Sequence, residues 1–341
     1  MTKQNFASDN YAGAHPKVLE WITKANQGPS PAYGGDDYTA RVETIFKSQF
    51  GKHTESFLVW NGTAANVLSL QCMAKPHQAI LCSQLSHIQE DECAAPEKHI
   101  GSKLLSLPIQ NGKINPRAID GFQKRIGDQH AAQPKVISIS QATEYGTIYS
   151  LKEIKTISKY AHDHGLYLHM DGARISNAAA ALKCTFKELT TDVGVDVVSF
   201  GGTKNGLLGA EAIVFLNSEL AQDFKYTRKQ GLHLASKMRF LAAQFLAFFE
   251  DDLWKENALQ ANGMAKLLEK EILNSCPSVK ITKPVQANSV FAILSPKQIK
   301  SLQKYFYFYV WNETLNEVRL MCSFDTTKEH VQSFVQKLCK S

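Results

Sequence analysis

One lysine, Lys204, stands in a glycine-rich turn directly after a predicted strand. The segment 196–209 reads DVVSFGGTKNGLLG, and its residues Val197, Val198 and Phe200 predict a short buried strand. The glycines that follow predict a turn whose backbone another group can approach. Burial among apolar residues and glycines disfavours the ammonium form, and the neutral amine is the nucleophile that forms a Schiff base with an aldehyde. This pattern indicates covalent binding of an aldehyde cofactor.

A simpler interpretation of the same segment is a hairpin, because Asn205–Gly206 is a common hairpin signal and most lysines near turns are solvated. A second segment favours the cofactor. Residues 166–174 read LYLHMDGAR and predict a strand that ends in Asp171, 33 positions before Lys204. Pyridoxal phosphate requires an acid that faces the ring nitrogen and a lysine at the aldehyde carbon. The two segments together predict that cofactor.

A phosphate site is expected at the segment 61–66, NGTAAN. It lies between a predicted strand and a predicted helix, so Gly62 and Thr63 would offer free amide groups at a helix N-terminus, where the dipole favours an anion. The segment is neither the GxGxxG fingerprint nor a Walker motif. A capped helix without any ligand remains an equally good interpretation of these residues alone.

His87 also follows a predicted strand, with an acidic run at 90–92 close behind it. An isolated histidine is more often a surface or core residue than a catalytic one, but an imidazole can stack on a flat ring and transfer protons. The HxxED spacing lacks the second histidine that zinc sites usually show, so no metal is predicted. The candidates share one feature: each follows a predicted strand, namely Gly62, Thr63, His87, Glu144, Asp171 and Lys204.

Alternating strands and helices predict an α/β fold, with a mainly parallel sheet between helices, whose ligands collect at the carboxyl ends of the strands. The expected strands are 57–60, 79–82, 103–107, 136–139, 166–170, 195–200 and 212–216. The pattern then changes to long helices at 234–250 and 254–273, three strands between 289 and 322, and a closing helix at 327–338. We therefore predict an N-terminal arm (1–35), a large domain (36–233) and a smaller α+β domain (234–341).

The composition is that of an ordinary globular protein, with 44% hydrophobic and 21% charged residues in a chain of 341. The net charge of +6 comes from scattered basic residues, which predicts no nucleic-acid partner. The seven cysteines show no CxxC and no paired spacing, so we expect free thiols and no disulfide framework. Free thiols, a first segment without an apolar core and the absence of a run long enough to span a bilayer predict a cytoplasmic protein without a membrane partner.

The ordered segments FASDNYAG, AYGGDDYT, NGTAAN, HMDGAR, FGGTKNG and SKMRFLAA resemble those of the low-specificity L-threonine aldolases. These are fold-type-I pyridoxal-phosphate enzymes, grouped with the β-eliminating lyases. The resemblance runs nearly end to end. It implies aldol cleavage of L-threonine, L-allo-threonine and related β-hydroxy-α-amino acids to glycine and an aldehyde. It also implies a homotetramer, a dimer of dimers with active sites at dimer interfaces.

The resemblance further implies a role for each matching residue. Lys204 would bind the cofactor covalently, Asp171 would pair with the ring nitrogen, and His87 would stack over the ring near the substrate hydroxyl and remove its proton. The phosphate would be held by Gly62, Thr63 and Thr203. Arg174 would lie near the ring hydroxyl and the substrate carboxylate, and this carboxylate would also be bound by Ser8 and Arg319. Tyr33 would line the edge of the site, from the same or a neighbouring subunit.

The chain departs from the family at one position, because many relatives place a histidine after the strand at 136–139, where this sequence has Glu144. This exchange puts in doubt any base role assigned there and bears on the preference at the substrate β-carbon. Other reactions of the same cofactor stay open: serine hydroxymethyl transfer, β-elimination and racemisation. A catalytically silent metabolite-binding protein is the alternative from another class, although binding alone needs neither Lys204 nor Asp171.

Overall fold

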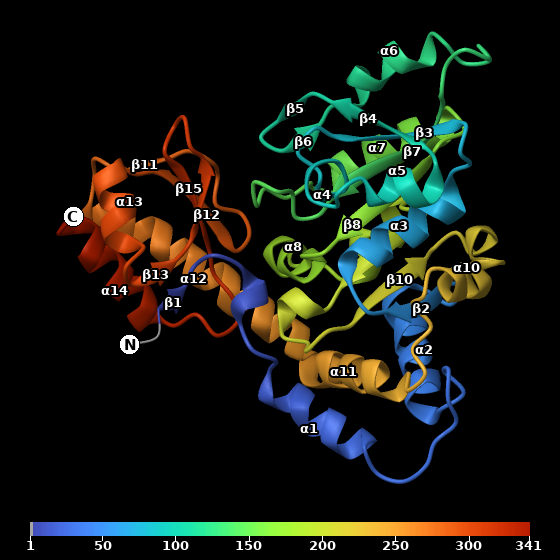
Figure 1. The fold of residues 1–341 in the computed structure, drawn as a ribbon, viewed down its shortest axis with the longest axis horizontal. Helices are drawn as coiled ribbons and strands as arrows, with labels where there is room; N and C mark the ends of the chain where they lie inside the picture. Colours follow the sequence, from blue (N-terminus) through green and yellow to red (C-terminus); the bar gives the residue numbers. More distant parts are fainter. Residues whose placement is uncertain (1–2) are drawn as a thin grey trace.

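The computed structural model describes residues 3–341 and shows a large α/β unit beside a smaller one (Figure 1). A seven-stranded sheet forms the centre of the large unit, and only its strand β10 runs against the others. In spatial order the strands are β2 (Glu55–Val59), β10 (Glu211–Phe215), β9 (Val197–Gly201), β8 (Tyr167–Gly172), β7 (Gln133–Ser140), β3 (Gln78–Ser83) and β4 (Lys103–Leu107). Each of the seven predicted strands falls on one of these. The predicted mainly parallel α/β sheet is therefore confirmed.

Helices cover both faces of this sheet, which is why its central strands are largely buried on both faces instead of alternating between buried and exposed residues. All five residues of β9 are buried, as are those of β10. The covering helices include α2 (Asp37–Phe50), α3 (Gly62–Met73), α5 (Ala95–Ile100), α7 (Leu151–Asp163), α8 (Ile175–Leu182), α10 (Phe224–Gln230) and α11 (Arg239–Phe249). Shorter elements are α4 (His87–Glu90), β5 (Ile109–Gln110), β6 (Lys113–Ile114), α6 (Asp120–Gln123) and α9 (Phe186–Leu189).

The smaller unit is an antiparallel sheet packed against helices. Its strands, in spatial order, are β11 (Lys280–Ile281), β12 (Ser289–Ile293), β15 (Glu317–Met321) and β14 (Tyr309–Asn312). Helices α13 (Pro296–Leu302) and α14 (Lys328–Cys339) belong to it, and the long helix α12 (Leu253–Ser275) runs from the large unit into it (Figure 1). An α+β C-terminal unit is what the sequence pattern predicts.

The N-terminal arm joins the two units. Its first strand, β1 (Gln4–Asn5), pairs in parallel with β13 (Phe306–Tyr307) of the smaller unit, and α1 (Pro16–Ala25) then packs against α11 in the large one (Figure 1). The domain ranges 1–35, 36–233 and 234–341 stay a prediction. The side chains of α11 are buried with those of α2 and β9 in one core, which supports a boundary inside α12.

One sequence-based prediction is wrong. Cys276 and Cys339 form a disulfide, whereas the sequence predicts seven free thiols. The two cysteines lie 63 positions apart, and only the packing of α12 against α14 brings the ends of these helices together. Sequence spacing carries no sign of that contact. The described free cysteines are Cys72, Cys82, Cys93, Cys184 and Cys322.

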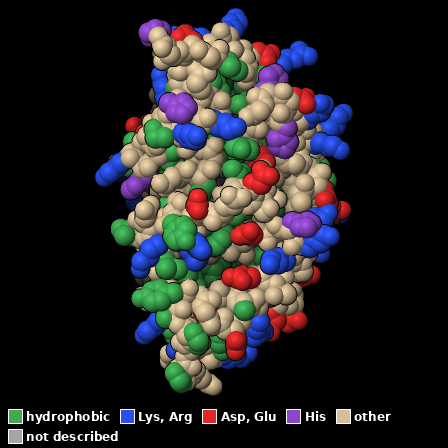
Figure 2. Space-filling view, turned by 90° about the vertical axis from the view of Figure 1, so that its right-hand side faces the viewer, with side chains coloured by type: hydrophobic (Ala, Val, Ile, Leu, Met, Phe, Trp, Pro, Cys, Tyr) green, Lys and Arg blue, Asp and Glu red, His purple; other side chains and the backbone are tan. Residues whose placement is uncertain are grey.

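The surface has no dominant charge on the face that Figure 2 shows, where Lys and Arg side chains are dispersed among acidic ones. Within residues 3–341, no helix combines the length and the apolar character needed to cross a membrane.

Candidate active site

A cavity of about 220 Å³ lies at the carboxyl edge of the parallel strands, where open α/β sheets bind their ligands. Side chains that follow four neighbouring strands line it: His87 after β3, Glu144 after β7, Asp171 at the end of β8 and Lys204 after β9. The smaller unit and the arm close the other side with Ser8, Asn10, Tyr309, Trp311 and Arg319. The cavity therefore requires both units and the arm.

Asp171 is 8% exposed and its two carboxylate oxygens are held by donors. Oδ1 accepts a hydrogen bond from the Ala173 amide at 3.0 Å, and Oδ2 accepts one from Asn66 Nδ2, also at 3.0 Å. Two residues earlier on the same face of β8, His169 is fully buried between Ser138 Oγ (2.9 Å) and Ser199 Oγ (3.0 Å). Burial lowers the pKa of His169 to about 4, so the ring beneath the site is neutral.

Lys204 sits in a 3₁₀ turn (Thr203–Asn205) between the antiparallel strands β9 and β10, so the hairpin and the cofactor interpretations both fit this segment. A Cβ on Gly201 would stand 2.4 Å from the Ala173 carbonyl oxygen, and one on Gly202 would stand 2.4 Å from Leu207 Cδ1. Only glycine therefore permits this close approach. Burial lowers the pKa of Lys204, and the nearby Arg174 charge adds to the effect. Both favour the nucleophilic amine.

Arg174 and Asp9 form a buried ion pair that joins the arm to the edge of the sheet. Arg174 Nε donates to Asp9 Oδ2 at 2.7 Å and Nη2 donates to Oδ1 at 2.9 Å, while Asn288 Nδ2 donates to Oδ2 at 3.2 Å. Burial opposes the charge on Asp9, but the Arg174 guanidinium outweighs it and keeps the pKa of Asp9 below its ordinary value. The ion pair engages Nε and Nη2 of Arg174 and leaves the other guanidinium donors available to another group.

Arg319 reaches the cavity from β15 with its hydrogen-bonding capacity largely unused. Its Nη2 donates to the Ala7 carbonyl at 3.3 Å, and its Nε is buried without a partner among the described residues. The guanidinium lies over the rings of Trp311 (4.9 Å) and Tyr309 (5.5 Å). Burial lowers the pKa of Arg319 to about 10, and the Arg174 charge contributes to the shift. A buried cation with free donors is suited to a carboxylate ligand.

His87 is held by a carboxylate that the sequence analysis did not select. His87 Nδ1 lies 2.8 Å from Glu92 Oε1, which also accepts a hydrogen bond from Asn66 Nδ2 at 2.9 Å. Asn66 therefore donates to both Glu92 and Asp171. The hydrogen bond with Glu92 raises the pKa of His87, although burial acts in the opposite direction.

Glu144 accepts a hydrogen bond from Ser140 Oγ at 2.6 Å through Oε1, while its Oε2 is buried and has no hydrogen-bond partner among the described residues. Burial raises the pKa of Glu144 to about 7, despite hydrogen bonds that lower it. Both the protonated and the ionised form of this carboxyl group are therefore populated near neutral pH.

The segment expected to hold a phosphate forms the N-terminus of α3. Asn61 caps the helix by accepting a hydrogen bond from the Ala64 amide at 2.9 Å, and Gly62 lines the cavity. A Cβ on Gly62 would meet nothing within 4 Å, so there is open space beside the start of this helix. Neither Thr63 nor Thr203 lines the cavity; the Thr203 hydroxyl accepts from the Ala210 amide at 3.3 Å.

Tyr33 is a third predicted site residue that does not line this cavity and, unlike Thr63 and Thr203, it is not adjacent to a residue that does. It is 53% exposed and lines a separate hollow with Arg228, and Lys229 Nζ lies 5.5 Å from the centre of its ring. Its amide donates to the Ser236 carbonyl at 3.0 Å, which fixes the loop on the outer surface.

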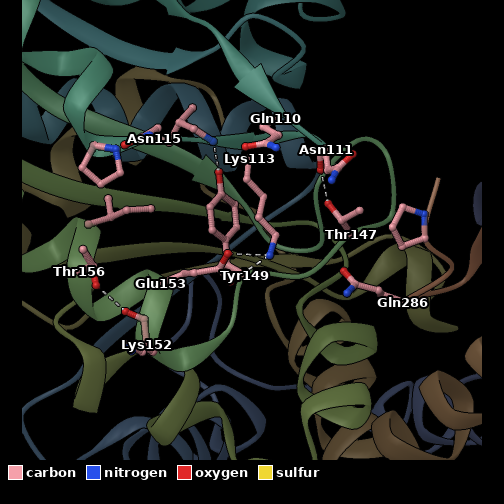
Figure 3. A pocket seen from close by; sticks show the side chains of 14 residues that line it. Gln110, Asn111, Lys113, Asn115, Thr147, Tyr149, Lys152, Glu153, Thr156 and Gln286 are labelled. Atoms are coloured by element: carbon pink, nitrogen blue, oxygen red, sulfur yellow. Dashed lines mark hydrogen bonds and ion pairs between the residues drawn. The ribbon is translucent and has the colours of Figure 1, made fainter.

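A larger cavity of about 450 Å³ contains none of the predicted site residues (Figure 3). It lies between the β5–β6 hairpin and the start of α7. Two of its charged groups are paired with each other, because Lys113 Nζ donates to both Glu153 carboxylate oxygens at 2.9 Å, and Tyr149 Oη accepts from the Ile114 amide at 2.8 Å (Figure 3). The chemistry of the chain is therefore concentrated in the smaller cavity. Among residues 3–341, no group of three or more His, Cys, Asp or Glu side chains is arranged to hold a metal ion.

The residues that sequence reasoning missed are mainly the partners of those it found: Asp9, Asn66, Glu92, His169 and Asn288. A signal existed for Asn66, because it stands four positions after Gly62 and so lies on the same face of α3. No comparable local signal marks Asp9 or Asn288, whose partners are 165 and 279 positions away.

Comparison with known proteins gives consistent matches. Residues 5–296 match the Beta-eliminating lyase family. The chain is 43% identical over 339 residues to the low specificity L-threonine aldolase of Pseudomonas aeruginosa, covering 98% of this chain and 97% of that protein. It is 44% identical over 331 residues to the enzyme of the same name from Pseudomonas sp. (strain NCIMB 10558), covering 96% and 95%.

The fold also matches that of a solved structure. The structure of a Leishmania major threonine aldolase superimposes with a TM-score of 0.93 at 27% identity, covering 99% of both chains. The resemblance, the fold class and the pyridoxal-phosphate-dependent lyase chemistry predicted from the sequence are confirmed at the level of the family. The family match spans most of the sequence, and the fold superimposes on that of a threonine aldolase. This chain therefore belongs to the Beta-eliminating lyase family.

Proposed function

We propose that this protein cleaves L-threonine, L-allo-threonine and related β-hydroxy-α-amino acids to glycine and an aldehyde, with pyridoxal 5'-phosphate as its cofactor. One observation carries the proposal: Lys204, Asp171 and Arg319 converge on a single cavity although they come from three separate parts of the chain. An amine with a lowered pKa, a buried carboxylate and an unsatisfied guanidinium are what a pyridoxal-dependent site for amino acids needs.

The residues present fit this cofactor. The amides of Gly62 and Thr63 would hold its phosphate, and Thr203 would support the turn behind it. Asp171 would pair with the ring nitrogen, and Lys204 would bind the aldehyde carbon. The bound cofactor withdraws electrons from the substrate Cα, which makes cleavage of the Cα–Cβ bond feasible. An ion pair at ~4 Å contributes roughly 4 kcal/mol at an effective dielectric near 20, so the carboxylate of Asp171 is important for this effect.

Arg319 would bind the substrate carboxylate, because its planar donors match a carboxylate better than a lysine does. Ser8 lines the same side of the cavity and would assist, and Arg174 would contribute the donors that Asp9 leaves free. Fixing the carboxylate at one end orients the Cα substituents relative to the ring. His87 would lie against the ring and hold a proton near the substrate hydroxyl, since Glu92 favours its charged form.

The test is an aldehyde-release assay on L-threonine, L-allo-threonine and L-serine, run beside an absorption spectrum. We expect acetaldehyde and glycine from the first two substrates, and a visible absorption band that Lys204→Ala abolishes. Pyruvate and ammonia from serine, without acetaldehyde from threonine, would indicate elimination instead. A protein that stays colourless after incubation with the cofactor would contradict the cofactor assignment.

We also propose that the protein is a homotetramer in which a second copy completes the site. The support is an apolar surface patch of Tyr33, Trp60 and Leu232, which are 53%, 46% and 87% exposed. All three residues lie close to the segment 232–236, because the Trp60 amide donates to His233 Nδ1 and the Tyr33 amide donates to the Ser236 carbonyl. Since Trp60 directly precedes the phosphate cradle, a partner seated here would bring its own Tyr33 towards a neighbouring site. Light scattering should give four times the monomer mass, and Leu232→Asp should lower it.

A cytoplasmic location is likewise a proposal; the five free cysteines support it, whereas the Cys276–Cys339 disulfide is a bond that a reducing compartment disfavours. Cell fractionation with an antibody against the native chain tests it.

A further inference from the structure

Glu144 is mounted on a segment that is fixed from two sides. At its start, the Gln141 amide donates to the Asp171 carbonyl at 2.8 Å, so the segment is tied to the strand that carries Asp171. At its end, the Ala287 amide donates to the Gly146 carbonyl at 3.1 Å, which ties the segment to the smaller unit. Glu144 lies between these two anchors and lines the cavity. The backbone that carries Glu144 is therefore anchored to both units.

At the second anchor, only glycine fits at position 146. Its φ of +70° is a conformation that favours glycine, and a Cβ there would stand 2.0 Å from Ser289 Oγ. The neighbouring Tyr145 packs edge-on against Phe291 at 5.6 Å and lies beneath Lys283 Nζ at 4.6 Å. This close packing holds the segment in place.

The two oxygens of the Glu144 carboxyl are in different situations. Oε1 accepts from Ser140 Oγ at 2.6 Å, whereas Oε2 is buried with no partner among the described residues. A buried carboxylate oxygen without a donor is costly, so the site favours either a proton on Oε2 or a ligand that donates to it. The same burial raises the pKa of Glu144 to about 7, which suits a group that accepts and returns a proton near neutral pH.

The other acidic groups around the cavity are less suited to accept a proton from a ligand. Both oxygens of Asp171 and both of Asp9 already accept hydrogen bonds. Glu92 Oε2 is likewise buried without a partner among the described residues, but Glu92 Oε1 is engaged by both His87 Nδ1 and Asn66 Nδ2, whereas Glu144 Oε1 accepts only from Ser140. The hydrogen bond with Glu92 raises the pKa of His87, which favours an imidazole that donates a proton over one that accepts it. Asp91 is exposed and has no ion-pair partner among the described residues, so it is the competitor that an experiment must exclude.

We propose that Glu144 Oε2 is the base that removes the proton from the substrate β-hydroxyl, a role that rests on the proposed aldol cleavage. In the step, the O–H bond breaks and its proton goes to Oε2. The O–H electron pair forms the second bond of the aldehyde carbonyl as the Cα–Cβ bond breaks, and the pair from that bond stays on Cα. In the reverse addition, the neutral acid returns the proton to the aldehyde oxygen. Ser140 is a positioning residue, because it acts only through Oε1.

Several ionisable groups surround Glu144 and contribute to its titration. They are His87, Asp171, Arg174 and Lys204 in the cavity, Cys82 on β3, and Tyr145 and Tyr149 on the same segment. A base must be ionised to act, so cleavage should be slow below the pKa of Glu144 and rise as the pH increases through it. This acidic limb belongs to Glu144 if it disappears when Glu144 is replaced.

The experiment compares Glu144→Gln with the wild-type holoenzyme in two reactions. Threonine cleavage needs the hydroxyl proton to be removed, whereas exchange of the glycine α-proton in deuterated water does not. We expect kcat for threonine to fall on the order of 100-fold, as typical general-base replacements do, and the acidic limb to vanish. Glycine exchange and the cofactor absorption band should stay within a few-fold of wild type.

Two further variants test whether another carboxyl group accounts for the effect. Glu97→Gln is the matched control, because Glu97 also has a buried oxygen without a partner but lies outside the cavity; it should cleave threonine normally. Asp91→Asn should keep the acidic limb. The proposal is overturned if Glu144→Gln cleaves threonine near the wild-type rate, if it loses glycine exchange equally, or if the limb vanishes in Asp91→Asn instead. Failure of the proposed function is distinct: the wild type itself would release no aldehyde.

Ser140→Ala supplies an independent readout. The Ser140 hydrogen bond lowers the pKa of Glu144, so its loss should move the acidic limb to higher pH while the rate above the limb is largely retained. A limb that does not move would contradict the assignment of Oε2 as the base.

Discussion

Asp9 and Arg174 form a two-point ion pair at 2.7 and 2.9 Å, although 165 positions separate them in the chain. Their side chains are 1% and 15% exposed, so the pair fastens the N-terminal arm to the active-site edge of the sheet in a place that water barely reaches. Removing one partner would leave the other charge buried and unpaired. The arm is consequently a structural part of the site, and the first prediction concerns this pair.

Asp9→Asn should lower the free energy of unfolding by ~3–5 kcal/mol, the usual cost of breaking a buried pair. Urea unfolding of Asp9→Asn, Arg174→Gln and the double variant measures the coupling. If the double variant is no more stable than the sum of the single losses predicts, the two side chains are not coupled and the account of the arm is wrong.

The same pair predicts a pH dependence. Because Arg174 keeps the pKa of Asp9 below its ordinary value, the stabilisation is present above the unfolded pKa of ~3.9 and is lost as pH falls through the folded value. The stability difference between wild type and Asp9→Asn should therefore shrink as the pH is lowered below about 4. A difference that stays constant down to the acid unfolding transition would contradict this.

Asn66 donates to both Asp171 and Glu92, so Asn66→Ala should weaken cofactor binding. The carboxylate assigned to the ring nitrogen, Asp171, would lose the donor to its Oδ2 at a cost of ~1–3 kcal/mol, which corresponds to roughly 5- to 150-fold in affinity. An absorbance titration with pyridoxal phosphate measures the dissociation constant. Gln71→Ala, an exposed change on the same helix, serves as the control and should bind as wild type does.

Gly201→Ala should displace the turn that carries Lys204, because its Cβ would stand 2.4 Å from the Ala173 carbonyl oxygen. We expect a loss of ~1–3 kcal/mol in stability, as for other overpacked sites, together with slower formation of the visible band. Gly209→Ala is the matched control, since a Cβ there meets nothing within 4 Å. Equal behaviour of the two variants would mean that the close approach at Gly201 does not position the lysine.

Arg319→Lys should raise the Michaelis constant for threonine at least tenfold and leave cofactor content unchanged. A lysine keeps the positive charge but loses the planar donors that match a carboxylate. Steady-state kinetics beside a cofactor assay provide the measurement. A parallel loss of cofactor would show that Arg319 supports the cofactor instead of the substrate.

The sequence predicted the parts of the site that follow from strand ends. Gly62, His87, Glu144, Asp171 and Lys204 all follow buried strands, and parallel strands bring their carboxyl ends to one edge whatever lies between them. Thr63 was predicted on the same grounds and Thr203 from the family resemblance, but neither residue lines the cavity. Local patterns identify the strand and its end, not the direction of every neighbouring side chain.

What the sequence did not reveal depends on contacts across long separations. The Asp9–Arg174 pair, the donor role of Asn66 and the disulfide of Cys276 with Cys339 all require the packing of segments whose spacing follows no short-range rule. The same limit explains why Tyr33, which was predicted to line the site, lies on the surface instead: its position is set by a loop fixed to Ser236. Periodicity cannot supply such contacts.

The most direct test of the central claim is to locate the covalent bond to the cofactor. The protein is incubated with pyridoxal phosphate, reduced with borohydride, digested and analysed by mass spectrometry. The account predicts the reduced cofactor on the peptide that contains Lys204, and no label on that peptide in Lys204→Ala. Label on a different lysine, or an unlabelled wild-type protein, would contradict it.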